Sequence, residues 1–183
     1  MSAYTATSMR KNDPMVDHGE VLVVQPGMET SFWQPVPANG FIDVLMTPAM
    51  VGMATKFGFG RQTVAPGCHV REHAHDRNEE LIHVVSGNGR AVIDGEDHPM
   101  QPGSTFFLGR NRRHMLINQG AENLVFLWLI LPNGLEDFFA AIGRPKHDGE
   151  PGPTPFARPT DVLAIEARTV FAPPPADGGR QPA

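Results

Sequence analysis

The 183-residue sequence lacks the features that mark several common protein classes. Its one cysteine, Cys68, excludes an internal disulfide and a zinc site built from several cysteines. Its longest apolar run, Leu124–Leu131, is far too short to cross a bilayer, and its start has no apolar core like that of a secretory signal. We therefore expect a cytoplasmic protein with no membrane partner.

Positive charge is also in short supply. The chain has 15 basic and 20 acidic residues, which gives a formal net charge of −5. Because binding to nucleic acid requires a basic face that neutralises phosphates, we expect no nucleic-acid partner.

Turn-forming residues, in contrast, are abundant, with 19 Gly and 18 Pro beside 40% hydrophobic residues. Turn signals separate short runs that are compatible with strands, which favours an all-β barrel or double-sheet jelly roll over a helical bundle. The expected strands are Val21–Val24, Phe41–Met46, Lys56–Val64, Leu81–Val85, Arg90–Ile93, Ser104–Phe107, His114–Ile117 and Leu124–Leu131.

The pattern changes after Pro132. Apolar residues at helical spacing predict one short helix in the stretch GLEDFFAAIG and a second within Thr160–Val170. We expect these helices to pack outside the barrel as a cover. The predicted organisation is a flexible tail (1–18), a barrel (19–132), a helical cover (133–172) and a second flexible tail (173–183).

Four side chains with metal-binding groups stand close to the expected strands. His73 and His75 are two residues apart, so on a strand they leave from one face, roughly 7 Å apart. Glu80 shares a strand face with apolar residues, and His114 opens a later strand. Taken singly, each of these is more often a surface residue than a ligand. Together, imidazoles with one carboxylate suit a first-row divalent metal.

The spacing of these residues resembles the signature motifs of the cupin superfamily. Gly67, five residues, His73-Ala-His75, four residues, Glu80, six residues and Gly87 reproduce the first motif. The second resembles Pro102-Gly103 through His114 to Asn118, although the segment before His114 is longer and more basic than usual. The resemblance implies a jelly-roll barrel in which His73, His75, Glu80 and His114 surround one metal ion. Iron(II) is the first expectation, with manganese, nickel, copper or zinc as alternatives.

Other polar residues near the motif are candidates for roles beside the metal. Glu79 competes with Glu80 as a ligand, but the gap to Gly87 and the strand parity favour Glu80, which leaves Glu79 as a catalytic residue at the rim. Arg71 is a candidate to hold an anionic or enolate oxygen of the substrate, and a salt bridge at the barrel mouth is the alternative. His69 is a weaker candidate for a proton shuttle. Phe57 and Phe59 would line an aromatic pocket or simply pack in the core.

The cupin resemblance implies a mononuclear metal enzyme that acts on a small molecule. Our first expectation is an iron(II) dioxygenase that uses O₂ to cleave a carbon–carbon bond in an enolisable or hydroxyaromatic substrate. The alternatives are a redox-neutral lyase, isomerase or decarboxylase, and a non-catalytic ligand sensor. No helix-turn-helix segment precedes the barrel in the sequence, so a sensor that regulates transcription is the less favoured form of this alternative.

We also expect a homodimer. The resemblance implies it, and in the sequence the strand-like run Val21–Val24 has no evident partner. Segment Glu20–Pro37 is therefore expected to cover a sheet edge of a neighbouring copy.

Overall fold

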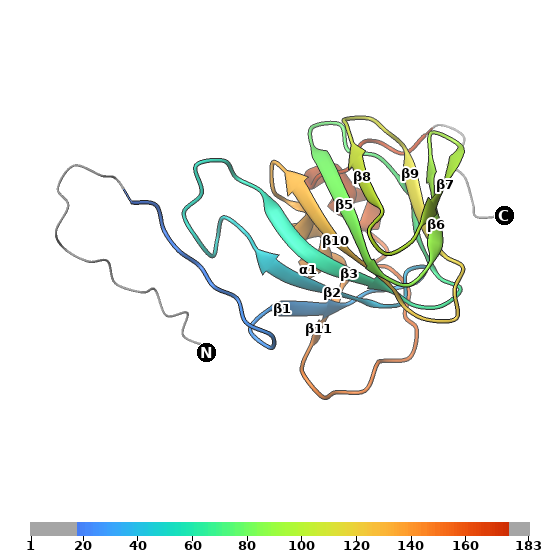
Figure 1. Ribbon diagram of the computed structural model, residues 1–183, viewed down its shortest axis with the longest axis horizontal. Coiled ribbons are helices and arrows are strands. Elements are labelled where there is room, and N and C mark those ends of the chain that lie inside the picture. Colours follow the sequence, from blue (N-terminus) through green and yellow to red (C-terminus); the bar gives the residue numbers. More distant parts are fainter. Residues whose placement is uncertain (1–17, 176–183) are drawn as a thin grey trace.

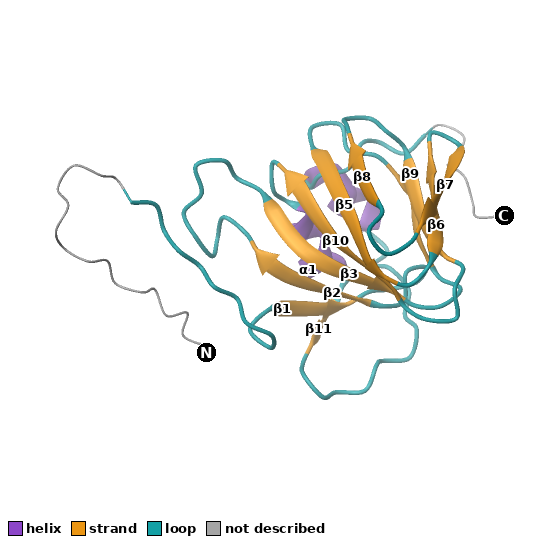
Figure 2. Cartoon of the chain, viewed as in Figure 1, coloured by secondary structure: helices purple, strands orange, loops and turns teal. Residues whose placement is uncertain are grey.

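The computed structural model describes residues 18–175 and consists of two facing β-sheets with two short helices (Figures 1 and 2). The strands are β1 (Thr30–Trp33), β2 (Phe41–Met46), β3 (Gly58–Val64), β4 (His69–His73), β5 (Glu79–Ser86), β6 (Gly89–Ile93), β7 (Glu96–Met100), β8 (Thr105–Leu108), β9 (His114–Asn118), β10 (Leu124–Leu131) and β11 (Arg144–Lys146). The larger sheet has the order β11-β1-β2-β3-β10-β5-β8, and the smaller has the order β4-β9-β6-β7. The expected all-β, jelly-roll type of fold is confirmed.

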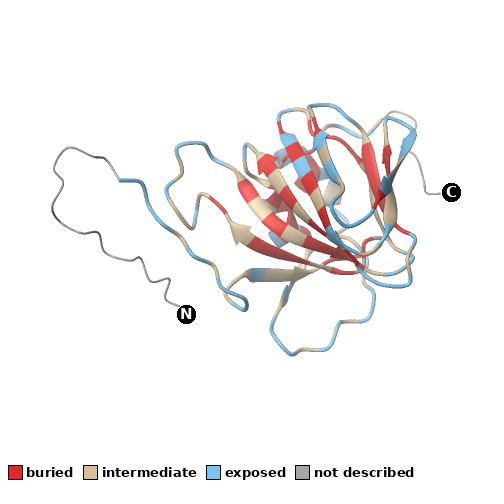
Figure 3. Cartoon of the chain, in the orientation of Figure 1, coloured by how far each residue is buried: buried red, intermediate tan, exposed pale blue. Residues whose placement is uncertain are grey.

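Residue alternation determines which face of the larger sheet is buried. In β5 and β10 every second residue is buried, and the pairing of Ile82 with Trp128 and of Glu80 with Ile130 places these four on the same face. The alternation is visible along the strands in Figure 3. One part of this concave face packs on the smaller sheet, in a cluster that includes Phe126.

Helices α1 (Leu135–Ile142) and α2 (Val162–Arg168) cover the rest of the concave face. Helix α1 buries an apolar stripe that includes Phe138 and Phe139, and the Phe139 ring lies 5.6 Å from that of Trp128. The segment after α2 adds Val170 and Phe171 to the same cluster. The helical cover that the sequence predicts thus closes the end of the barrel that the smaller sheet leaves uncovered (Figure 2).

The strand predictions hold for most of the barrel and are wrong at its start. Val21–Val24 forms no strand, because this run is exposed and pairs with nothing among the described residues. Strand β1, which begins at Thr30, fills the expected place instead. Strands β4, β7 and β11 are likewise absent from the expected ranges. The strand through His73 that the metal argument assumes is β4, but it ends at His73, so His75 lies beyond it.

The expected exchange of Glu20–Pro37 with a neighbour meets a structural limit. Strand β1 pairs with β2 and β11 of its own chain, so only the residues before it extend away from the body (Figure 1). The predicted tails fall mainly on residues 1–17 and 176–183, which lie outside the described residues. Within residues 18–175, neither helix is long and apolar enough to span a membrane.

Candidate metal centre

Four side chains from different parts of the fold meet at the concave face of the larger sheet. His73 ends β4 and His114 begins β9, and these two residues are paired across the smaller sheet. Glu80 comes from β5 of the larger sheet, while His75 lies in the loop after β4. Each is buried, with 1% to 9% of its surface exposed. The facing sheets therefore bring together the residues that the spacing of the sequence selected.

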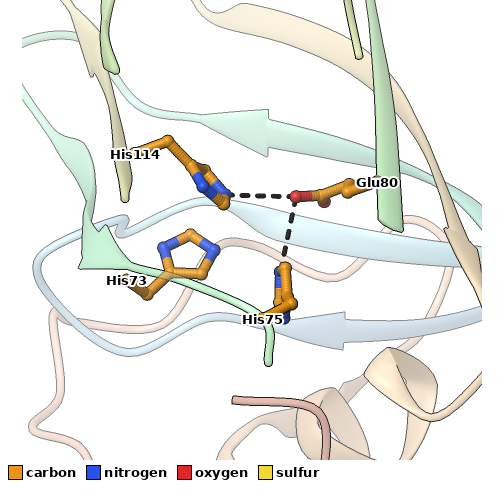
Figure 4. Close-up of side chains that lie close together, drawn as sticks. All are labelled: His73, His75, Glu80 and His114. Carbon is orange, nitrogen blue, oxygen red and sulfur yellow. Dashed lines mark ion pairs between the residues drawn. The ribbon is translucent and has the colours of Figure 1, made fainter. Parts of the chain in front are cut away.

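The four groups are close enough to share one ion. Their candidate ligand atoms all lie within 4.8 Å of one another. Glu80 Oε2 is 3.1 Å from His114 Nε2 and 3.4 Å from His75 Nε2. His73 lies beside these three residues (Figure 4). The His73 and His114 rings are 4.1 Å apart between centroids. The arrangement is a buried set of three histidines and one glutamate.

A carbonyl oxygen fixes the orientation of each imidazole. His73 Nδ1 lies 2.8 Å from the Arg71 carbonyl oxygen, and His114 Nδ1 lies 2.9 Å from that of Arg112. His75 Nδ1 lies 2.9 Å from the carbonyl oxygen of Val170. A carbonyl only accepts, so each Nδ1 carries the proton in these hydrogen bonds, and the lone pair of each neutral ring is on Nε2.

The donor set fits a cation. His75 Nε2, His114 Nε2 and Glu80 Oε2 are buried and have no hydrogen-bond partner among the described residues. Neutral imidazole nitrogens and a carboxylate oxygen are all acceptors, and a buried acceptor without a partner is costly. One divalent metal ion at their common point would satisfy all of them, and nitrogen with one oxygen donor suits the first-row metals.

Charges inside the cluster shift the pKa values of its members. Burial and the neighbouring charges of His114 and His75 hold the pKa of His73 well below its ordinary value. Burial also disfavours charge on His75, but the Glu80 carboxylate 3.4 Å away outweighs it and raises the pKa of His75. For Glu80, the two histidines overcome the effect of burial, so its pKa falls far below the usual range. Glu80 is therefore an anion at neutral pH.

The C-terminal segment supports the centre from the side opposite the smaller sheet. Besides the Val170 carbonyl, Phe171 packs against the rings of both His73 and His75, at 5.3 and 5.2 Å between centroids. The Ala172 N–H donates to the Ala74 carbonyl at 2.8 Å, between these two histidines in the chain. The loop before β9 contributes as well, since the Asn111 N–H donates to the His75 carbonyl at 2.7 Å. The longer form of the second motif thus holds the His75 loop.

The two carboxylates at the start of β5 have different surroundings. Glu80 points into the cluster, whereas Glu79 is exposed on the other face of the strand and lines a separate surface hollow with Arg77 and Arg110. A catalytic role for Glu79 stays a prediction, to which its position lends no support. Asn118 is buried, and its side chain donates to the Val64 and Glu122 carbonyls, which is a structural role.

A pocket opens beside three of the four candidate ligands, His73, Glu80 and His114. Its apolar wall comes from α1 and the C-terminal segment, and includes Phe138, Phe139 and Phe171. Arg71 and His69 line it as predicted for groups near the metal, together with the buried amides of Gln34 and Gln62. Burial lowers the pKa of His69.

Phe57 and Phe59, which were expected to pack in the core or to line an aromatic pocket, are absent both from this pocket and from the buried core of the described residues. Phe59 lies on the outer face of β3, and the Trp128 ring lies against Gly58 and Gly60 on the inner face. The helical periodicity of α1 predicted the buried phenylalanines but not their place beside the metal centre. Arg158, Gln34 and Gln62 also line the pocket. No pattern in the sequence marks them, because the pocket forms only when distant segments of the chain come together.

Residues 60–130 match the family model described as the Cupin domain. This chain has the cupin fold. The matched stretch runs from β3 to β10 and contains all four candidate metal ligands.

Several curated proteins are similar in sequence to this chain. The tetracenomycin polyketide synthase protein TcmJ of Streptomyces glaucescens is 28% identical over 68% of this chain and 79% of its own length. The polyketide synthase CurC of Streptomyces cyaneus is 30% identical over 51% of this chain and 60% of its own length. An oxalate-binding protein of Thermotoga maritima is 30% identical over 40% of this chain and 60% of its own length. The last two are thus matched over less than two thirds of their length.

Solved structures resemble parts of this chain. The crystal structure of a predicted oxalate decarboxylase from Thermotoga maritima has 25% identity and a TM-score of 0.46, covering 51% of this chain and 83% of that one. A sugar phosphate isomerase of the cupin superfamily from Silicibacter pomeroyi has 24% identity and a TM-score of 0.43, covering 49% of this chain and 59% of that one.

Proposed function

We propose that this cupin is a metal-dependent enzyme for an oxygen-rich substrate of the polyketide kind, one that carries enolisable or hydroxyaromatic oxygens. The observation that carries this proposal is the position of the His73–His75–Glu80–His114 cluster beside a pocket with an aromatic wall. The two Streptomyces relatives named as polyketide synthase proteins point to the same substrate class.

The reaction that we favour is redox-neutral enolate chemistry, such as ring closure, isomerisation or decarboxylation. The bound metal supplies a Lewis acid that stabilises negative charge on a substrate oxygen. Phe138, Phe139 and Phe171 bind the carbon skeleton and exclude water, because they form the apolar wall of the pocket. His69 lines the same pocket with a lowered pKa, so its neutral ring is available to accept a proton from a substrate carbon.

Iron(II) dioxygenase activity with carbon–carbon cleavage is the second candidate. The three imidazoles and one carboxylate are a donor set that would hold iron(II), and iron(II) would supply the activation of O₂. The same residues would bind the substrate in both reactions, so the metal and the consumption of O₂ distinguish them.

The experiment compares the protein loaded with iron(II), manganese(II) or zinc(II), using 2′-hydroxyacetophenone, the ortho-hydroxyaryl methyl ketone, as the probe. Redox-neutral chemistry predicts metal-dependent exchange of the methyl protons with deuterium, followed by NMR, without uptake of O₂. Dioxygenase chemistry predicts O₂ uptake with iron(II) alone and cleavage products. Glu80→Gln is the matched inactive control. A protein that binds the probe but supports neither reaction with any of the three metals would instead be the non-catalytic sensor.

We also propose that the protein is a homodimer. Val21 and Val23 are 73% and 60% exposed on an extended segment, and Phe107 is 67% exposed on β8, the edge strand of the larger sheet. Exposed apolar groups on a segment and on a sheet edge favour pairing with a second copy. Light scattering of the full chain and of a chain without residues 1–28 tests this, and an unchanged dimer in the shortened chain would reject an exchanged segment.

A further inference from the structure

Three charged side chains form a network at the border of the metal pocket. Arg71 on β4 and Arg158 in the connector before α2 both contact the same oxygen, Oε1, of Glu166 on α2; the Arg158 Nη1 distance is 3.1 Å. Glu166 is buried, with a side chain that is 8% exposed, whereas the side chains of Arg71 and Arg158 are 26% and 31% exposed. A buried carboxylate shared by two guanidinium groups leaves one positive charge in excess.

The network separates two hollows. Arg71 and Arg158 line both the inner pocket, which reaches His73, and an outer pocket on the far side, while Glu166 lines the outer pocket. The contacts to Glu166 use one nitrogen of each guanidinium, which carries five N–H donors in total. Both guanidinium groups thus lie between their resident carboxylate and the space beside the metal centre.

The remaining charges near the network do not cancel the excess. The outer pocket is also lined by Glu72 and Arg113, one acidic and one basic side chain. The Glu72 carbonyl accepts from Arg71 Nη1 at 3.0 Å, and Arg113 donates to the Pro173 carbonyl at 3.3 Å. In the inner pocket the carboxylate of Glu80 belongs to the metal cluster. Apart from Glu80, the charged side chains that line the two hollows therefore leave one positive charge in excess, which the two arginines present beside the inner pocket.

We propose that Arg71 and Arg158 form a recognition site for an anionic oxygen of the substrate, a carboxylate or an acidic enolate, with Glu166 as a resident counter-ion. A planar anion attached to a ring or a conjugated chain fits this place, because Phe171 lies under the Arg71 guanidinium at 5.4 Å and continues the aromatic wall. Paired guanidinium donors match the two oxygens of such a group. The site rests on the proposed function for its role in catalysis and assigns the substrate a negative charge away from the metal.

The behaviour of Glu166 distinguishes a counter-ion from a residue that only supports the fold. If Glu166 only held the fold, its loss would weaken every property of the pocket. As a resident counter-ion it competes with the substrate for the same two guanidinium groups. Its neutralisation must then strengthen the binding of an anion, since an uncompensated buried charge gains most from a new partner.

The experiment is a calorimetric titration of the full-length protein with benzoate and with benzamide, its neutral counterpart of the same shape, at low salt. It is run after removal of metal by chelation and again with zinc restored. Wild type is expected to bind benzoate about tenfold more tightly than benzamide. Arg158→Gln should abolish that preference, because a charge-assisted hydrogen bond typically accounts for a factor of this size or more. Arg158→Lys, which keeps the charge, should retain part of it.

Two further variants separate recognition from structure. Glu166→Gln is expected to bind benzoate more tightly than wild type and to gain more thermal stability from it. Arg168→Gln changes an exposed arginine on the same helix and should behave as wild type. Equal affinities for benzoate and benzamide, an unchanged preference in Arg158→Gln, or weaker benzoate binding by Glu166→Gln would each overturn the proposal.

The titration separates this proposal from the proposed function. Benzoate recognition by the metal-free protein does not depend on turnover, so its failure would leave metal-dependent chemistry standing. In turn, a protein that neither exchanges the protons of 2′-hydroxyacetophenone nor consumes O₂ would not contradict the proposed anion site.

Discussion

The concave face of the larger sheet has two covers that differ in how the chain encodes them. The smaller sheet covers one part and contributes His73 and His114, each held by a carbonyl two residues earlier in its own strand region. The C-terminal helices and the segment after them cover the other part. The Val170 carbonyl in that segment holds His75 from 95 residues away in the sequence. The comparison teaches that one metal site is built from a local motif and from a remote segment that carries no motif.

The strongest test removes a ligand from the local half. Glu80→Gln replaces the only carboxylate of the cluster by a neutral amide, so metal binding should fall from one ion per chain to nearly none. Elemental analysis of the purified protein measures the stoichiometry. Glu79→Gln is the matched control, because Glu79 lies on the outer face of β5, and it should keep its metal. A metal-free Glu79 variant would reverse the assignment of the two residues.

A second test weakens the remote half alone. Phe171→Ala removes the ring that packs on His73 and His75 and should lower metal affinity by about 10- to 100-fold, the usual range for groups that orient ligands. Competition with a chromogenic chelator measures the affinity. Phe171→Leu retains most of the packing volume and should stay closer to wild type. If both variants bind metal like wild type, the helical cover is not part of the centre.

A third test disturbs the larger sheet beneath the helical cover without touching a ligand. A Cβ at Gly60 would lie 2.4 Å from the Trp128 ring and 2.5 Å from the Asp43 carbonyl oxygen, so Gly60→Ala forces neighbouring atoms to move. We expect a loss of about 1–3 kcal/mol in the free energy of unfolding, measured with urea, and an unchanged metal stoichiometry. Gly109→Ala, where a Cβ would meet nothing within 4 Å, is the control and should cost far less.

The smallest expected effect is a dependence on pH that centres on His75. Its pKa is raised above the ordinary 6.5 because Glu80 outweighs the effect of burial. In the metal-free protein the stabilisation from this pair is fully present below about pH 6.5 and is lost as pH rises through the raised pKa. Metal binding requires the neutral ring, so metal affinity should rise with pH over the same window, by up to about tenfold per unit. Chelator competition at several pH values measures this affinity. An affinity that does not change with pH would contradict the link between metal binding and loss of the His75 proton.

The sequence was sufficient to predict the part of the site whose spacing is local. His73 ends one strand, Glu80 lies at the start of the next and His114 opens a later one, and the faces on which these three lie follow from alternation, which is a property of the backbone itself. His75 follows two residues after His73, in the loop that leaves that strand. Arg158, Glu166 and Val170 could not be predicted, because their roles arise only when the C-terminal segment packs back over the barrel.

The errors in the strand predictions have a related cause. Val21–Val24 has the side chains of a strand, but a strand also needs a partner, and pairing is not visible in a single run of residues. Strand β7 has the reverse character, since its sequence EDHPM is polar and contains a proline, yet it pairs with β6. Asp94 and Gly95 between them both have positive φ, at 49° and 92°, and the Asp-Gly signal for a hairpin was present in the sequence.

The hydrogen bond between His75 and the carbonyl of Val170 has a consequence for damaged copies of this protein. A polypeptide that ends early, or that a protease trims before residue 170, keeps every metal-binding side chain but loses the group that aims one of them. We therefore expect the metal content of a preparation to show whether its chains extend as far as Val170.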